Sequence, residues 1–154
     1  MKYILTQTYL ACGLLAHLTT AAIDHTCTDL EVKFDGAGSP IFLTAKCQNR
    51  ENTATQCSEL NLNLCYRLQL GSSVDNPSIA VGSNGGNFGR YCTDCGATNS
   101  PDPTVKYCTC VAYEDNGKLI YGEVEIDLNE GTIIQDSNGF LQCFDHTAAA
   151  MDNC

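Results

Sequence analysis

The sequence predicts an all-β fold that is cross-linked by disulfides and built from two tandem copies of one motif. Three observations indicate this class. Short segments alternate apolar and polar residues, as strands with one buried face do. Cysteine is abundant, which is typical of small domains in oxidising compartments. Landmarks also recur in the same order in the two halves of the chain, which indicates a duplication.

Residues 1–22 are expected to be a signal peptide. Lys2 supplies a positive start, an apolar stretch runs from Tyr9 to Leu18, and small residues follow, a pattern that signal peptidase recognises. The apolar run is shorter than the roughly 20 residues that span a membrane. We therefore expect cleavage after Ala21 or Ala22 and an extracellular, secreted product without membrane insertion.

Cysteine usage supports an extracellular location. The chain has 11 cysteines, and removal of Cys12 with the signal peptide leaves an even number. Five disulfides can then form, each stabilising the fold by about 2–4 kcal/mol through restriction of the unfolded chain.

Strand patterns dominate the remaining sequence. Residues 41–46, 60–64 and 123–129 each alternate apolar and polar side chains, as half-buried strands do. Turn-forming residues separate these runs. The strongest of them is Asn116-Gly117, which predicts a two-residue type I′ hairpin between strands near 108–113 and 118–121. A short helix over Thr147–Asp152 is also compatible with the sequence.

The repeat has three landmarks. Cys27-Thr28-Asp29 recurs as Cys92-Thr93-Asp94, Cys47 recurs as Cys110, and Glu59–Asn63 recurs as Glu125–Asn129, all at offsets near 65 positions. Two copies favour a pseudo-symmetric pair over a solenoid. The prediction is one domain over 23–144, with repeat one at about 27–85, repeat two at about 86–144, and a C-terminal tail at 145–154.

The charge of the chain excludes some partners. The formal net charge is −10 and the sequence has no basic cluster, so we expect no nucleic acid among the partners. Acidity of this kind fits a soluble extracellular protein.

The duplicated motifs resemble the cyanovirin-N-like lectins, especially the fungal forms, over about Ile23 to Cys143. The shared pieces include Leu43-Thr44-Ala45-Lys46-Cys47, Gly86-Asn87-Phe88 and Asn138-Gly139-Phe140-Leu141. The resemblance implies two pseudo-symmetric halves that exchange segments, each with a small antiparallel sheet and a hairpin. It also implies a monomer that binds mannose-type oligosaccharides on glycans or glycoproteins, with one site in each half. No cofactor, metal ion or catalysis is implied.

Disulfide pairings follow from the same resemblance. It implies Cys27–Cys47 and Cys92–Cys110, and the fungal relatives add Cys95–Cys108. The pairing of Cys57, Cys65, Cys143 and Cys154 stays open among three combinations.

The resemblance also implies the carbohydrate-binding residues. They come from the segment before each first cysteine, the loop after each second cysteine and the late glycine turn. The candidates are Thr26, Gln48, Asn49, Arg50, Glu51, Asn87, Arg90, Tyr113, Glu114, Asp136 and Asn138. Arg90 stands where the prototype has an acidic contact residue. The chain has no Trp, so Tyr66, Tyr91, Tyr113 or Tyr121 would have to supply any stacking surface, although such residues are more often packed in strands.

Other chemistries are weaker alternatives. Cys92-x2-Cys95 with Cys108-x-Cys110 has zinc-ligand spacing, but in a secreted chain two disulfides are favoured. Glu123, Glu125 and Asp127 lie on one strand face and lack the opposing wall that a glycosidase needs, so we predict no enzyme. The main alternative function is a secreted, effector-like module that binds protein and has lost sugar binding, because a fold does not dictate its function.

Overall fold

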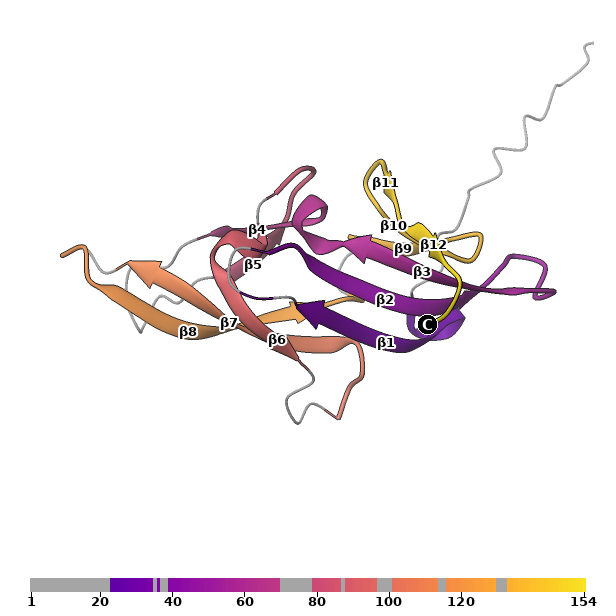
Figure 1. The fold of residues 1–154 in the computed structure, drawn as a ribbon, viewed down its shortest axis with the longest axis horizontal. Helices are drawn as coiled ribbons and strands as arrows, with labels where there is room; N and C mark the ends of the chain where they lie inside the picture. The colour runs from indigo at the N-terminus through magenta and orange to yellow at the C-terminus, as the bar shows by residue number, and fades with distance from the viewer. Residues whose placement is uncertain are drawn as a thin grey trace, which may run out of the picture.

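The computed structural model describes residues 23–34, 36, 39–69, 79–86, 88–96, 101–113, 116–129 and 133–154. The expected signal peptide, residues 1–22, lies outside these ranges. The described part of the chain is elongated and consists almost wholly of antiparallel strands (Figure 1). This confirms the predicted all-β class.

The first half begins with a single helical turn and a meander of three strands. The elements are α1 (Ile23–Thr26), β1 (Cys27–Phe34), β2 (Ile41–Gln48) and β3 (Thr55–Asn61), followed by the 3₁₀ turn η1 (Leu62–Leu64) and a hairpin of β4 (Tyr66–Gln69) and β5 (Ile79–Gly82). Strands β1, β2 and β3 form one antiparallel sheet in that order.

The second half repeats this order of elements. It contains the 3₁₀ turn η2 (Phe88–Arg90), the meander β6 (Cys92–Gly96), β7 (Val105–Tyr113) and β8 (Leu119–Asp127), and a hairpin of β9 (Ile134–Ser137) and β10 (Phe140–Cys143). After this hairpin, β11 (His146–Thr147) pairs with β10, and β12 (Ala149–Met151) pairs with β3.

The backbone reproduces the duplication in detail. The first strand of each meander carries a bulge, and within the bulge Asp29 and Asp94 adopt left-handed φ values of +55° and +52°. At the end of each meander, Asn61 and Asp127 accept a hydrogen bond from the backbone N–H two residues later, at 3.0 and 2.8 Å. Such side-chain bonds compete with the strand ladder and end the strand. The two halves are therefore structural copies.

The two copies exchange their hairpins. Strand β10 of the second copy packs on β2 and β3, while β5 of the first copy packs against β8. The backbone N–H of Leu141 donates to the buried Ser58 hydroxyl at 3.2 Å, which fixes the second copy's hairpin on the first copy's sheet. This exchange brings the β9–β10 turn to the loop that follows β2.

Five disulfides hold this arrangement. Three are the pairs that the resemblance implies, Cys27–Cys47, Cys92–Cys110 and Cys95–Cys108. The four cysteines left open pair as Cys57–Cys154 and Cys65–Cys143. The last residue of the chain is thus tied to β3, and the start of the β4–β5 hairpin is tied to the end of β10.

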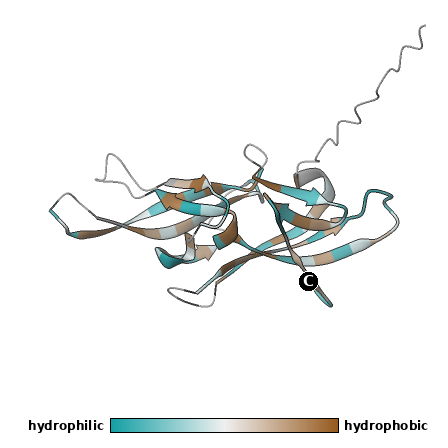
Figure 2. Ribbon diagram, turned by 90° about the horizontal axis from the view of Figure 1, so that it is seen from above, coloured by the Kyte–Doolittle hydropathy of each residue, from teal (hydrophilic) through white to brown (hydrophobic). Residues whose placement is uncertain are grey.

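One core runs through both halves. Apolar residues alternate with polar ones along the strands (Figure 2). The inward members are buried together with eight of the ten disulfide-bonded cysteines, all but Cys57 and Cys154. The largest fully buried apolar side chains are Phe88, Ile23, Ile41, Leu43, Leu60, Leu62, Ile126, Leu128 and Leu141.

Three local expectations are wrong. The strand expected to run to residue 64 ends at Asn61, where η1 begins. Tyr113 pairs with Leu119, so residues 114–118 connect β7 to β8 and the hairpin is not a two-residue turn. Residues 147–152 contain strand β12 and no helix, because pairing with β3 and the Cys57–Cys154 bridge hold this segment extended.

Candidate functional site

A polar cavity of about 250 Å³ lies where α1, the end of β2 and the β9–β10 turn meet. It draws on three segments that are far apart in the sequence. The lining residues are Thr26, Gln48, Asn49, Arg50, Asn52, Asp136 and Asn138. All seven side chains end in an amide, guanidinium, carboxylate or hydroxyl group, which are groups that can bond to a ligand's hydroxyls.

Asn49 organises the loop over residues 49–54. Its side-chain oxygen accepts from the backbone N–H of Thr53 at 2.9 Å and of Ala54 at 3.2 Å, and its amide nitrogen donates to the Thr53 hydroxyl at 2.9 Å. Its backbone N–H donates to the Ala54 carbonyl at 2.9 Å. Because these contacts occupy both ends of the amide, Asn49 shapes the cavity wall and positions its neighbours.

The β9–β10 turn forms the opposite wall. Ser137 pairs with Phe140, and the two residues between them, Asn138 and Gly139, have φ values of +56° and +91°. This is the type I′ geometry that Asn-Gly favours. The Asp136 carboxylate accepts from the Gly139 N–H at 2.7 Å and so stabilises the turn from within.

One hydrogen bond joins the two walls. The backbone N–H of Arg50 donates to the Asn138 side-chain oxygen at 3.2 Å, across 88 residues of sequence. The Cys27–Cys47 bridge ties the first residue of β1, directly after Thr26, to β2 just before the loop. The cavity shape therefore depends on long-range contacts that no single segment contains.

The structure brings together six of the residues implied by the resemblance, namely Thr26, Gln48, Asn49, Arg50, Asp136 and Asn138. Glu51 is exposed on the same loop and is not among the lining residues. The sequence interpretation missed Asn52, which lines the cavity with a φ of +52°. Its signal was its residue type, since Asn tolerates left-handed backbone better than most residues.

Only part of the expected second site falls within the residues that the structure describes. Arg90 lies exposed on η2, and its guanidinium lies 5.5 Å from the ring centroid of Tyr91. Tyr113 is the last residue of β7, while Asn87 and Glu114 lie outside the described residues. The second site stays a prediction.

The tyrosines differ widely in exposure. Tyr66 is 2% exposed and packs against Phe88 with ring centroids 6.2 Å apart, so it belongs to the core. Tyr91 is half-buried, and Tyr121 is 63% exposed on β8. Among these three, only Tyr121 offers an open ring face.

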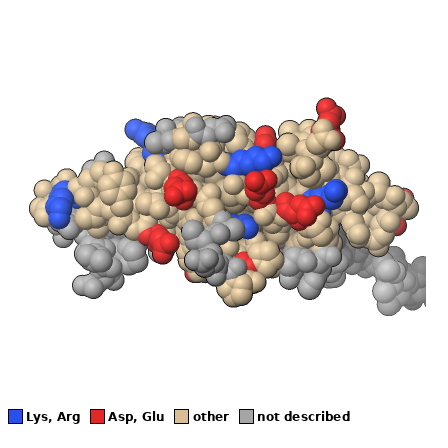
Figure 3. All heavy atoms as spheres, turned by 60° about the horizontal axis from the view of Figure 1, so that its bottom comes forward, with Lys and Arg blue, Asp and Glu red and all other residues tan. Residues whose placement is uncertain are grey.

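The carboxylates of β8 lie on a solvated face. Glu123 and Glu125 are exposed, and Glu125 accepts a hydrogen bond from the Tyr107 hydroxyl at 3.1 Å. This bond, together with the negative charge of Glu125, raises the pKa of Tyr107 above its ordinary value. The face shown in Figure 3 mixes acidic and basic side chains without a basic cluster.

Two further observations concern the described residues alone. No group of three or more His, Cys, Asp or Glu side chains in them is arranged to hold a metal ion. None of their helices has the length and apolarity needed to cross a bilayer.

The geometry defines a class of protein: a disulfide-bonded β-protein of two segment-exchanging copies with a polar loop cavity. Residues 24–142 match the family model of the CVNH domain, and the chain belongs to this cyanovirin-N-like family. This confirms the resemblance noted in the sequence.

Solved structures are similar to this chain at low sequence identity. The protein in "Microvirin:mannobiose complex" is 20% identical, with a TM-score of 0.52, over 79% of this chain and 97% of that one. The N. crassa protein NcCVNH is 15% identical, with a TM-score of 0.48, over 80% of this chain and 98% of that one. A comparison with curated proteins gives no match.

Proposed function

We propose that the protein is a secreted lectin that binds mannose-type oligosaccharides in the cavity between the 49–54 loop and the β9–β10 turn. The observation that carries this proposal is the convergence of six residues implied by the family resemblance on one cavity. Membership of the cyanovirin-N-like family supports it, and a structure with the same fold is titled as a complex with mannobiose.

The chemistry of the cavity suits a neutral glycan. Gln48 and Arg50 are exposed at its rim and offer an amide and a guanidinium to the ligand. Asp136 and Asn138 supply acceptors from the facing turn. Hydrogen bonds of this kind contribute about 0.5–1.5 kcal/mol each, or about 1.5–3 kcal/mol where one partner is charged. Recognition needs no covalent step, so we propose no catalytic activity.

Arg50→Ala with Glu51→Ala as its matched control tests the proposal. The two residues are adjacent, charged and exposed, but only Arg50 lines the cavity. Isothermal titration of the fully oxidised protein with mannobiose should show binding that Arg50→Ala weakens by roughly 10- to 150-fold, the equivalent of about 1.5–3 kcal/mol. Glu51→Ala should change the affinity less than about threefold.

A glycan array probed with the same oxidised protein measures which glycans it binds. Enrichment of mannose-terminated glycans supports the proposal. Failure to bind any glycan would overturn it and favour the alternative of a protein-binding module on a lectin scaffold. Equal weakening by both alanine variants would place the binding outside this cavity.

A further inference from the structure

The outer edge of β8 marks a difference between the two copies. In the first copy, β12 adds a fourth strand to the sheet by pairing antiparallel with β3 over Cys57–Glu59. The repeat makes Glu123–Glu125 of β8 the counterpart of this segment. The first copy shows that this fold accepts an added strand here, and among the described residues none occupies the equivalent place on β8.

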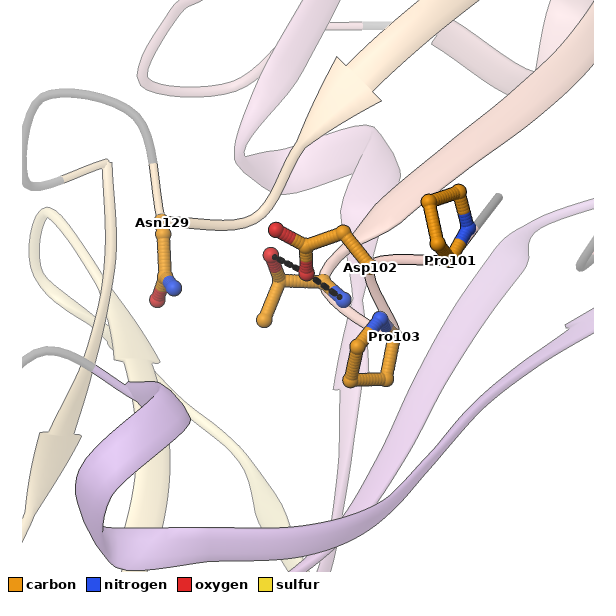
Figure 4. Close-up of a pocket in the computed structure, with 5 residues that line it drawn as sticks. Pro101, Asp102, Pro103 and Asn129 are labelled. Atoms are coloured by element: carbon orange, nitrogen blue, oxygen red, sulfur yellow. Dashed lines mark hydrogen bonds between the residues drawn. The ribbon is translucent and has the colours of Figure 1, made fainter.

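Backbone hydrogen bonds show which groups of β8 face outward. The N–H of Leu128, directly after β8, donates to the Thr104 carbonyl at 3.0 Å. Thr104 is itself held by the Asp102 carboxylate, which accepts from its hydroxyl at 2.6 Å and from its N–H at 2.8 Å (Figure 4). Residues of an antiparallel strand bond alternately to its two sides, and the β7–β8 register is regular. Even-numbered residues of β8 therefore bond to β7, and odd-numbered residues direct their N–H and C=O groups to the outer edge.

The segment 119–125 of β8 is accessible. Leu119 is 40% and Tyr121 is 63% exposed, and both glutamates of the segment are exposed as well. A Cβ placed on Gly122 would meet no atom within 4 Å. Figure 1 shows the β7–β8 hairpin reaching beyond the other strands at one end of the molecule. A strand from another molecule therefore has space to align with this edge.

The side chains of this segment favour a basic partner. Its odd-numbered residues lie on one face of the strand, with apolar groups at Leu119 and Tyr121 and carboxylates at Glu123 and Glu125. The Tyr107 hydroxyl donates to Glu125 at 3.1 Å and holds that carboxylate on the same face. Cross-strand pairs of opposite charge, and pairs of apolar side chains, stabilise a sheet. The matching strand therefore carries basic residues opposite the two glutamates and apolar residues opposite the other two positions.

A second copy of the chain matches this pattern poorly. Antiparallel pairing of residues 119–125 with themselves places Tyr121 opposite Glu123 and Leu119 opposite Glu125. Each chain also has a formal net charge of −10, which opposes self-association. Strand β8 contains no Lys or Pro, the residues that often protect an exposed edge. Its charge thus disfavours its own copy and leaves the edge suited to a basic strand.

We propose that residues 119–125 of β8 bind a basic, extended segment of a partner protein as an added antiparallel strand. The segment carries two Lys or Arg residues at alternate positions, followed by two apolar residues at alternate positions. Main-chain hydrogen bonds supply the affinity of such a pairing, and the alternate side chains supply its specificity. The edge shares no residue with the cavity at Arg50, so this inference is independent of the proposed lectin function.

Amide hydrogen exchange followed by NMR tests this edge, with the oxidised protein and the peptide acetyl-Arg-Thr-Arg-Thr-Val-Thr-Val-amide. In the free protein the Tyr121 and Glu123 amides should exchange quickly, while the Val124 amide, which faces β7, exchanges slowly. Near-saturating peptide should slow exchange at Tyr121 and Glu123 by roughly tenfold or more and leave Val124 unchanged. The same peptide with Glu in place of both Arg residues should give no protection.

Matched variants localise the binding. Glu123→Lys should weaken the affinity for the basic peptide by roughly 3- to 30-fold, because an attractive cross-strand pair becomes repulsive. Glu31→Lys makes the same change of net charge at an exposed residue of β1 and should change the affinity less than about twofold. Tyr121→Pro, which removes an outward N–H, should weaken binding more than Tyr121→Ala does. Mannobiose binding should be the same in Glu123→Lys as in the parent protein.

Three kinds of result would overturn the proposal. Slow exchange of Tyr121 and Glu123 in the free monomer would mean that the chain itself covers the edge. Protection that grows with protein concentration without peptide, together with dimers in analytical ultracentrifugation, would assign the edge to a second copy. Absence of protection by the basic peptide, equal protection by the acidic one, or equal weakening by Glu123→Lys and Glu31→Lys would show that no basic strand pairs here.

Two provisions keep the test decisive. Should Tyr121→Pro fail to form five disulfides by mass, the comparison of Glu123→Lys with Glu31→Lys decides alone. Failure of the parent protein to bind mannobiose would refute the lectin function and leave the result at β8 unaffected.

Discussion

Removal of the Cys57–Cys154 bridge tests the nested arrangement of the disulfides. Taken alone, this bridge closes a loop with a sequence separation of 97, for which the chain-entropy relation gives about 4.7 kcal/mol. The Cys65–Cys143 bridge lies inside this loop and shortens it. The path then runs 8 residues from Cys57 to Cys65 and 11 residues from Cys143 to Cys154. A loop of that size corresponds to about 3 kcal/mol.

The double substitution Cys57→Ser and Cys154→Ser should therefore lower the free energy of unfolding by about 3 kcal/mol. Packing adds little, because Cys57 is half-buried and Cys154 is exposed. Urea unfolding followed by circular dichroism measures the change, and mass spectrometry verifies that four disulfides remain. A loss near 5 kcal/mol would mean that the two bridges act independently. A loss below about 1 kcal/mol would refute the chain-entropy argument for this bridge.

Three further predictions concern the β9–β10 turn, the carboxylate of Asp102 and the pKa of Tyr107. Gly139→Ala should cost about 1–2 kcal/mol in urea unfolding, since the φ of +91° disfavours a side chain, and it should weaken mannobiose binding. The hydrogen bonds from Thr104 to the Asp102 carboxylate stabilise the fold at pH values above 3.8, the pKa of Asp102 in the unfolded chain. Because the pKa of Asp102 is lower in the folded protein, this stabilisation is lost as the pH falls through that lower value. The stability difference between the parent protein and Asp102→Asn should therefore shrink in acid; a constant difference would contradict this linkage. Glu125→Gln should lower the pKa of Tyr107 toward its ordinary value in an ultraviolet titration, and an unchanged pKa would show that the Tyr107–Glu125 bond does not form in solution.

The duplication could be predicted from the sequence because the cysteines and the alternation of apolar and polar residues recur in both halves. Cys27 and Cys92 open equivalent meanders, and the first strand of each meander carries a bulge at the same place. The burial of Ile126 and Leu128 also follows from alternation alone. The repeat and the buried face of each strand could therefore be predicted without a structure, because both depend only on local sequence patterns.

Turn geometry was less accessible because it depends on strand register. Asn116-Gly117 and Asn138-Gly139 carry the same local signal, yet only the second forms a two-residue hairpin. The first lies within a connection of residues 114–118, because Tyr113 pairs with Leu119. Pairing between strands sets the length of the connection, and a dipeptide does not encode that pairing.

The cavity at Arg50 could be predicted only through the family resemblance. Nothing in the composition of residues 48–52 indicates that Asp136 and Asn138 lie beside them. The exchange of hairpins places Asp136 and Asn138 beside this loop, where the Arg50 backbone N–H donates to the Asn138 side-chain oxygen. Asn52 was missed because the resemblance carries over only Gln48, Asn49, Arg50 and Glu51 from this loop, while the cavity also takes in Asn52.

The exchange also means that neither copy contains a complete cavity. The first copy supplies Thr26, Gln48 and Arg50, while the second supplies Asp136 and Asn138 from its terminal hairpin. That hairpin is held on the first copy's sheet by the Leu141–Ser58 hydrogen bond and by the Cys65–Cys143 bridge. A chain that ends before β9 would keep the 49–54 loop and lose the facing wall. Duplication in this fold therefore does more than double a binding unit, because each copy's hairpin completes the structure of the other.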